Sequence, residues 1–357
     1  MNRSFFHRVF PPPKFLKMPA GGIDISDSSI HFAELKEGKS GLVVSGFGEK
    51  EIKKGIIEGG EIKNIKELTR ILSSMKEEFG LSFVNVSLPE QRAYLFKLRV
   101  PELGYGNIRS SVELQIEDNV PISAKDAVFD YDIIKEDDGQ IDIELSVFPK
   151  SIVDGYLDVI KDSGLIPLSF EIEAQAIARS VVPYGDNGTF MVIDFGKTRS
   201  GISIVSNGTT RFTSTVDIGG NSLTKAIEKT LRIKTNEAET IKREKGVMSR
   251  EENEELFLTM MSIVGVLKDE INKHYVYWHT HKDQYGRKRP KIEKVILCGG
   301  DANLSGLPEY LSTGLNVPVD RANVMVNVNS FDMYIPEINF NESLQYATAI
   351  GLALRNT

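Results

Sequence analysis

Two aspartates, Asp24 and Asp194, each stand at the end of an apolar run and before a turn that carries hydroxyl side chains. Residues 190–193 are apolar and favour strands, so we expect a buried strand that ends at Asp194. A carboxylate at this position can hold a hydrated Mg²⁺ ion, and the turn that follows can face phosphate oxygens. An ordinary hairpin whose aspartate caps its own turn has the same local pattern, so either segment alone leaves both interpretations open.

The repetition of the pattern favours phosphate binding. Asp24 aligns with Asp194, and the hydroxyl of Ser28 aligns with that of Thr198. Two units of this kind predict two related halves that close on one nucleotide. The candidate phosphate-binding residues of the two turns are Ser26, Ser28, Ser29, Gly196, Lys197, Thr198 and Ser200.

Two glycine pairs lie just before predicted helices. Gly299 and Gly300 follow an apolar strand and allow close backbone approach, which suits the base-binding side of a nucleotide. Asn303 follows them at the predicted helix start. Gly219 and Gly220 precede another predicted helix, whose N-terminus would attract an anion. We therefore add these five residues to the candidate nucleotide site.

In this order and spacing, the three motifs resemble the ATPase fold of actin, Hsp70 and sugar kinases. Within that fold the chain is similar to the PilM family of type IV pilus assembly, over about residues 22–355. Further matching segments are residues 112–122, 130–131, 165–167, 173–176, 218–220 and 346–353. The resemblance implies an α/β, actin/Hsp70-like fold of two lobes, built from duplicated ribonuclease-H-like halves with an inserted 1C subdomain like that of FtsA.

The resemblance also implies a division of the chain into subdomains, preceded by a basic leader. We expect the leader over residues 1–22 and the insertion, subdomain 1C, over residues 83–165. Subdomain 1A would comprise residues 23–82, 166–188 and 342–357. Subdomain 2A would comprise residues 189–220 and 291–341, and subdomain 2B residues 221–290.

The ligand implied by the resemblance is ATP or ADP with Mg²⁺. Asp24 and Asp194 would hold the Mg²⁺ ion, largely through water. Glu239 and Lys242 match helix positions that contact ribose and base across the fold. Gln175 lies on the expected connecting helix and is our candidate for positioning an attacking water.

One departure from the family pattern concerns turnover. The first phosphate turn of the family typically has glycine and then serine, whereas this chain has Ser26 and Asp27. Ser26 lacks the conformational freedom of glycine, and Asp27 adds a negative charge near a triphosphate unless Mg²⁺ or Lys197 offsets it. His31 also stands where the family often has lysine. We therefore prefer an ATP-binding scaffold with slow or absent hydrolysis. The alternatives are an active actin-fold ATPase, or an adaptor of secretion or cell division like GspL or FtsA.

The partner implied by the resemblance is the short cytoplasmic tail of PilN, a membrane protein, and the pilus assembly ATPases are possible further partners. The tail would lie as an extended peptide in a groove formed by residues 84–88, 92–98 and 112–122. We therefore expect a cytoplasmic protein that is peripheral at the inner face of the plasma membrane through its partner. The sequence ends at Thr357 without the membrane span of GspL or the amphipathic helix of FtsA, which favours PilM.

Composition narrows the remaining possibilities. A chain of 357 residues exceeds the usual size of a single core, so two lobes are expected. The net charge of −7 argues against general nucleic-acid binding, and we expect no nucleic-acid partner. The single cysteine, Cys298, excludes a disulfide framework. Residues 279–290 are basic and aromatic and lack a family counterpart, so we expect a surface loop. His279 and His281 have no further ligands at suitable spacing, which argues against a metal site.

Overall fold

A computed structural model describes residues 19–356, except residues 40, 102–104, 138, 248–252 and 284–285. Most of the expected basic leader therefore lies outside the described residues. No helix in these ranges is long and apolar enough to cross a bilayer.

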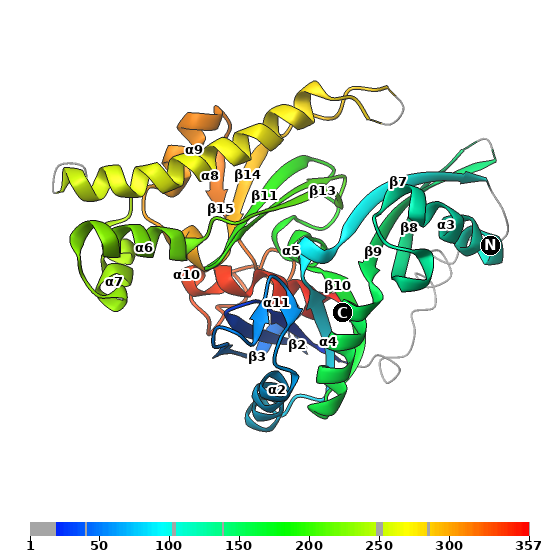
Figure 1. Ribbon diagram of the computed structural model, residues 1–357, viewed down its shortest axis with the longest axis horizontal. Helices are drawn as coiled ribbons and strands as arrows, with labels where there is room; N and C mark the ends of the chain where they lie inside the picture. Colours follow the sequence, from blue (N-terminus) through cyan, green and yellow to red (C-terminus); the bar gives the residue numbers. More distant parts are fainter. Residues whose placement is uncertain are drawn as a thin grey trace.

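Two five-stranded sheets form the centres of two lobes (Figure 1). Each begins with three antiparallel strands and adds two parallel strands on the side of its first strand. The first sheet has the order β3 (Gly41–Glu51), β2 (Ser29–Gly38), β1 (Gly21–Ile25), β6 (Phe83–Leu88) and β10 (Ile166–Ile172). The second has the order β13 (Thr209–Val216), β12 (Ser200–Ser206), β11 (Thr189–Phe195), β14 (Lys294–Cys298) and β15 (Val319–Arg321). This identical topology confirms the duplicated halves.

Helices cover both sheets and connect them. The first lobe carries α2 (Ile65–Phe79) and α4 (Lys150–Asp162), which bury one apolar face each in its core. The second lobe carries α6 (Gly220–Leu231), α7 (Thr235–Lys245), α8 (Glu254–Thr280) and α9 (Leu307–Leu315). The core of the second lobe also includes residues of α5 (Glu173–Val181) and α11 (Ala347–Ala353), while α11 contacts β1 of the first lobe. The remaining short elements are β4 (Ile57–Glu58), β5 (Glu61–Ile62) and α10 (Phe340–Ser343).

A third, smaller core belongs to the insertion. Strands β7 (Tyr94–Pro101), β9 (Gln140–Pro149) and β8 (Ala127–Asp137) form one sheet, and α3 (Tyr105–Asn119) supplies buried residues to its core. Two expected boundaries of the insertion differ from this arrangement. Strand β6 pairs with β1 and β10 in the first sheet, and α4 packs into the core of the first lobe. The apolar runs in both elements belong to the first-lobe core, a long-range partnership that local pattern cannot reveal.

Two glycines allow α11 to approach its neighbours closely. A Cβ atom on Gly351 would lie 1.8 Å from the carbonyl oxygen of Ala176 in α5. A Cβ atom on Gly22 of β1 would lie 1.9 Å from the carbonyl oxygen of Ala349. Because backbone cannot move aside as a flexible side chain can, these contacts fix how α5 and α11 cross beside the first sheet.

Substitution of Gly351 by alanine should therefore destabilise the protein by about 1–3 kcal/mol, since overpacking forces the backbone apart. Urea unfolding followed by circular dichroism measures this change. Gly155 is the matched control, because it lies within α4 and a Cβ atom there meets nothing within 4 Å. Gly155→Ala should stabilise the fold by about 0.5–1 kcal/mol, since alanine is the better helix former. Equal effects of the two changes would contradict the packing argument.

Candidate functional site: a carboxylate cluster between the lobes

Asp24 and Asp194 occupy equivalent places in the two lobes. Each lies near the end of the first strand of its sheet, on β1 and β11. The Ser87 hydroxyl donates a hydrogen bond of 2.7 Å to Asp24 Oδ1, and the Asp194 charge raises the pKa of Asp24. The two aspartates that the repeated motif predicted therefore share one site between the lobes.

Two glutamates that the sequence analysis did not select extend this cluster. Glu173 is the first residue of α5, and Glu90 follows β6 in a short 3₁₀ turn at residues 90–92. Burial raises the pKa of Glu90 well above its usual value, and the charges of Glu173 and Asp194 raise it further. A glutamate just after a strand is a weak sequence signal, because only the fold shows which strand ends meet.

Burial is also the main cause of the other raised pKa values. It raises the pKa of Asp24 to about 6, and those of Asp194 and Glu173 to about 7. The neighbouring carboxylates add to the shift at each position. Near neutral pH the cluster therefore holds protons readily and would gain free energy from a cation.

Arg199 joins the two lobes across this cluster. It lies in the second phosphate turn, and its Nη1 atom is 3.0 Å from Asp27 Oδ2 in the first turn. Its Nη2 atom is 3.6 Å from Glu173 Oε1. These three side chains are at most 17% exposed, so solvent screens the ion pairs only weakly.

Asp27 is also held by the backbone. Its carboxylate accepts hydrogen bonds from the amides of Gly59 at 3.1 Å and Gly60 at 3.0 Å. Arg92 Nε donates to the Gly59 carbonyl, and the Tyr156 hydroxyl donates to the Gly60 carbonyl. Arg199 and these amides therefore offset the charge of Asp27, and Lys197, the residue expected to do so in the absence of Mg²⁺, lies 3.9 Å from Glu51 instead.

In the first phosphate turn, backbone amides of the turn bind the side chain of Ser26. Ser26 Oγ accepts hydrogen bonds from the amides of Ser28 at 3.3 Å and Ser29 at 3.1 Å, and it donates to the Ser29 carbonyl. Ser26 has a negative φ angle, so the serine causes no strain there. Its effect is chemical: its hydroxyl occupies amides that a glycine would leave available for phosphate oxygens.

The second turn is closed against the start of α6. The amides of Gly220 and Asn221 donate to the carbonyls of Gly196 and Lys197. A Cβ atom on Gly219 would lie 2.6 Å from the backbone of this turn. Gly219 thus allows the helix start to pack on the turn. The carbonyls of the turn already accept hydrogen bonds from two of the helix-start amides that we expected to attract an anion. The Ser200 hydroxyl likewise donates to the Ile218 carbonyl, whereas Lys197 and Thr198 remain exposed.

Gly299 and Gly300 have different surroundings. Gly299 has a φ angle of +88°, and a Cβ atom there would lie 2.4 Å from Asp194 Oδ1. Only glycine fits this approach to the carboxylate. At Gly300 the nearest atom to a Cβ would be 3.7 Å away, on Gln345, so a Cβ would fit there in ordinary van der Waals contact. Asn303 Nδ2 donates to the Asn341 carbonyl at 2.7 Å.

Lys242 and Glu239 belong to a polar network in the second lobe. Lys242 Nζ is 2.6 Å from Asp301 Oδ1 and 2.9 Å from Glu239 Oε2, which also accepts from the Thr224 hydroxyl. Lys242 is buried, and Asp301 lies over Gly220, where a Cβ atom would touch its carboxylate. The sequence analysis missed Asp301, although it directly follows the glycine pair. Glu239 and Lys242, which were predicted to contact ribose and base, are therefore both paired with other side chains of the protein.

Gln175 shares α5 with Glu173. Two residues apart on an α-helix is a rotation of about 200°, so the two side chains point to nearly opposite sides. Since Glu173 faces Arg199, Gln175 points away from that contact. Gln175 as the residue that positions water stays a prediction, and Glu173 is the α5 side chain that reaches the carboxylate cluster.

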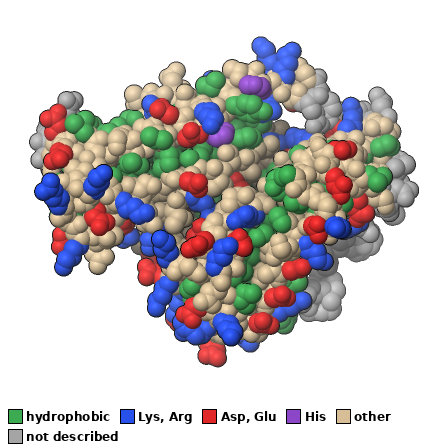
Figure 2. Space-filling view, in the orientation of Figure 1, with side chains coloured by type: hydrophobic (Ala, Val, Ile, Leu, Met, Phe, Trp, Pro, Cys, Tyr) green, Lys and Arg blue, Asp and Glu red, His purple; other side chains and the backbone are tan. Residues whose placement is uncertain are grey.

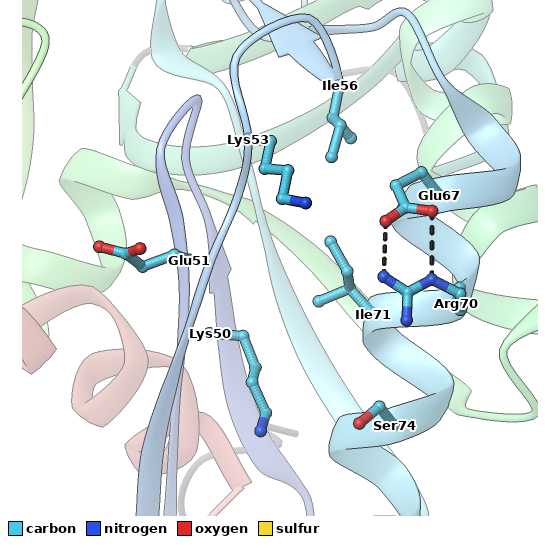
Figure 3. A pocket seen from close by; sticks show the side chains of 8 residues that line it. All are labelled: Lys50, Glu51, Lys53, Ile56, Glu67, Arg70, Ile71 and Ser74. Atoms are coloured by element: carbon cyan, nitrogen blue, oxygen red, sulfur yellow. Dashed lines mark hydrogen bonds and ion pairs between the residues drawn. The ribbon is translucent and has the colours of Figure 1, made fainter.

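A pocket outside the cleft lies on the first lobe between α2 and the chain that follows β3 (Figure 3). Its volume is about 200 Å³, Ile56 and Ile71 form its apolar part, and Lys53 extends over it. Arg70 and Glu67 form a bidentate ion pair at its rim. Lys50 pairs with Glu78 and Glu51 lies 3.9 Å from Lys197, both outside the pocket, and we assign no ligand to it. In the described ranges, no three or more His, Cys, Asp or Glu side chains form a metal-binding group.

The raised pKa values predict how stability depends on pH. Asp24, Asp194 and Glu173 bind protons more tightly in the folded state, so their stabilising contribution is lost as pH rises through about 6–7. Burial lowers the pKa of His31 to about 4, so this residue makes stability rise with pH, but it is one group against three. The melting temperature should be a few degrees higher at pH 6 than at pH 8, and Mg²⁺ should raise it more at pH 8. Asp194→Asn should reduce both differences; an unchanged pH dependence in this variant would contradict the cluster.

Three solved structures resemble this fold over nearly its whole length. A chain of a PilM–PilN type IV pilus biogenesis complex is 18% identical, with 95% of this chain and 99% of that chain covered and a TM-score of 0.81. The ethanolamine utilization protein EutJ from Carboxydothermus hydrogenoformans is 16% identical, with 96% and 93% covered and a TM-score of 0.55. MreB5 of Spiroplasma citri bound to AMPPNP is 12% identical, with 94% and 96% covered and a TM-score of 0.56. These likenesses identify an actin-like fold.

A family model gives the more specific result. The model described as type IV pilus assembly protein PilM matches residues 22–357, which is nearly the whole chain. This match agrees with the resemblance drawn from the phosphate motifs. The chain belongs to the PilM family of type IV pilus assembly proteins.

Proposed function

We propose that this chain is a nucleotide-responsive scaffold of type IV pilus assembly that binds Mg-ATP or Mg-ADP between its lobes and a PilN-like tail on its insertion. The observation that carries the nucleotide site is the meeting of Asp24 and Asp194 at equivalent strand ends. The similar fold of MreB5, solved with ADP and with AMPPNP, supports the same choice of ligand.

The residues present fit a divalent cation that is held largely through water, since no three described side chains group closely enough to ligate it directly. Asp24, Asp194, Glu90 and Glu173 influence one another's pKa values, and Arg199 is the cation that lowers all four. Glu90 Oε1 has no hydrogen-bond partner among the described residues. Asp24 and Asp194 would hold Mg²⁺, largely through water, and the ion would offset the charge of the phosphates. A Mg²⁺ ion would stabilise the charged carboxylates, which burial and their mutual repulsion disfavour.

Arg199 makes the site responsive to its ligand. Guanidinium groups bind carboxylate and phosphate oxygens alike, so a phosphate in the cleft competes with Asp27 for Arg199. If Arg199 turns to the phosphate, Asp27 keeps only the amides of Gly59 and Gly60. The contact that now joins the two phosphate turns would thereby depend on nucleotide.

The first turn favours slow hydrolysis. The Ser26 hydroxyl occupies two of its amides, which weakens the positioning of phosphates. Glu173, whose pKa burial raises to about 7, could accept a proton from water, and Arg199, 3.6 Å from its carboxylate, lowers that pKa only in part. The occupied amides therefore support a scaffold over an active ATPase.

Mg-ATP should raise the melting temperature, because a ligand at 100 times its dissociation constant stabilises a protein by about 2.7 kcal/mol. Asp27→Asn should increase ATP affinity by about threefold to tenfold, since it removes the charge that competes for Arg199. Asp194→Asn, the matched change at the metal-binding carboxylate, should abolish the Mg²⁺-dependent part of the shift. Isothermal titration measures the affinities.

Two results would count against this proposal. One is the absence of any shift at millimolar ATP in protein that circular dichroism finds folded. The other is weaker ATP binding by Asp27→Asn. Hydrolysis should stay well below about 10 per second, the median for enzymes. A sustained rate near that value, abolished by Asp194→Asn, would identify an active ATPase instead.

The insertion supports binding of an extended peptide. Strand β7 pairs only with β9 in its sheet, so its other edge can accept a further strand. Leu114 on α3 is 82% exposed and offers an apolar anchor. The expectation that residues 84–88 line the groove was wrong, because they form β6, a buried strand. The match to the chain of a PilM–PilN complex supports a PilN-like tail as the peptide, and this tail would bring the protein to the inner membrane.

A synthetic PilN-like tail peptide should protect amides of β7 and α3 from hydrogen exchange and leave α8 unchanged. Leu114→Glu should weaken its binding by about tenfold, the loss expected when one apolar anchor becomes charged. Ile335→Glu is the matched control, because Ile335 is 85% exposed and lies outside the insertion. Protection confined to α8, or equal loss of affinity in both variants, would contradict this placement of the peptide.

A further inference from the structure

Helix α8 presents a long exposed face to solvent. It has 27 residues, is about 40 Å long at 1.5 Å per residue, and runs along the outer edge of the second lobe (Figure 1). One face buries residues in the second-lobe core, among them Met260, Val264 and Leu267. Hydrophobic side chains are also visible along this edge from outside (Figure 2).

The exposed face carries an apolar stripe. Leu258, Val266 and Val276 are 58%, 51% and 46% exposed. Leu258 and Val276 are 18 residues apart, which is five full turns, and Val266 lies within about a quarter turn of them. Ser262, Asp269 and Lys273 are exposed between them on the same face, so apolar and polar side chains alternate along the stripe at steps of three and four residues.

The two ends of α8 carry opposite charge. Glu254 and Glu255 lie in its first turn. The segment 282–291, just beyond its last turn, has five Lys or Arg residues and one Asp, in a chain whose net charge is −7. Arg289 stacks over the rings of Tyr277 and Trp278, and Trp278 Nε1 donates to the Pro290 carbonyl at 2.7 Å. These contacts fix the basic segment against the end of the helix.

We propose that α8 is a dimer interface, on which α8 of a second copy of this chain packs antiparallel. This orientation sets Leu258 of one copy opposite Val276 of the other and brings the two Val266 side chains close to the two-fold axis. It also sets the acidic start of each helix beside the other copy's basic segment, so opposite charges meet at both ends of the symmetric contact. A head-to-tail contact would join the charged ends but leave the apolar stripe uncovered. The dimer requires neither nucleotide nor the PilN-like tail.

Sedimentation of the full chain, without nucleotide or peptide, tests this interface. We expect a concentration-dependent species with twice the 39.8 kDa mass of the chain. Val266→Glu should raise the dissociation constant tenfold or more, because it sets two carboxylates together at the axis. Tyr184→Glu is the matched control, since Tyr184 is 98% exposed and belongs to the loop after α5, not to α8. A monomer at all concentrations, or a dimer that tolerates Val266→Glu, would overturn the proposal.

Charge reversal tests the orientation. A variant with Glu254→Lys and Glu255→Lys should be monomeric, because it sets like charges together at both ends, and one with Lys282→Glu and Lys288→Glu should dimerise more weakly, because its basic segment then has no net charge. An equimolar mixture of the two should form heterodimers, since the acidic start of the second variant then meets the basic segment of the first. Added salt should weaken the wild-type dimer, as screening shortens from about 10 Å at 0.1 M to about 3 Å at 1 M. An open series of larger masses in the mixture would show head-to-tail assembly and overturn the antiparallel arrangement.

Discussion

A single guanidinium group among buried carboxylates is the constraint on which the cleft depends. Arg199 contacts Asp27 and Glu173 directly and lowers the pKa values of Asp24, Asp194 and Glu90 through its charge. Without a positive charge at this position, the cluster would have to bind protons or open to water. The contact between the lobes therefore depends on neutralising the negative charge of the buried carboxylates. Protons, Arg199 and a divalent cation can each neutralise part of that charge.

The duplicated motif made the centre of the site predictable. A strand, an aspartate and a hydroxyl-rich turn occur twice, so Asp24 and Asp194 could be aligned before any fold was known. The local pattern did not reveal Glu90, Glu173 or Asp301, because each enters the site or its border only through contacts between elements distant in sequence. The expected bounds of the insertion, residues 83–165, differ from the structure for the same reason. The apolar runs in β6 and α4 are equally compatible with a place in the first lobe or in the insertion.

The glycines show how the same residue type serves different purposes. At Gly300 a Cβ would make only ordinary van der Waals contact with Gln345, so no packed neighbour requires glycine there. Gly219, Gly220 and Gly299 instead allow the second turn, Asp301 and Asp194 to approach the backbone. Sequence reasoning assigned all four to the nucleotide because a missing side chain suits a ligand and a packed neighbour equally well. Only the neighbours of each absent Cβ atom distinguish the two.

The short hairpin of β4 and β5 touches both ends of the insertion. Gly59 accepts from Arg92, two residues before β7, and Gly60 accepts from Tyr156 of α4, which follows β9 directly. The amides of the same two glycines hold Asp27, so the hairpin is the joint between the cleft and the insertion. Thermodynamic linkage makes such a joint act equally in both directions. If a nucleotide changes the affinity of the insertion for a peptide by some factor, the peptide changes the affinity of the cleft for nucleotide by the same factor. A membrane-bound partner would then set the nucleotide state of the scaffold.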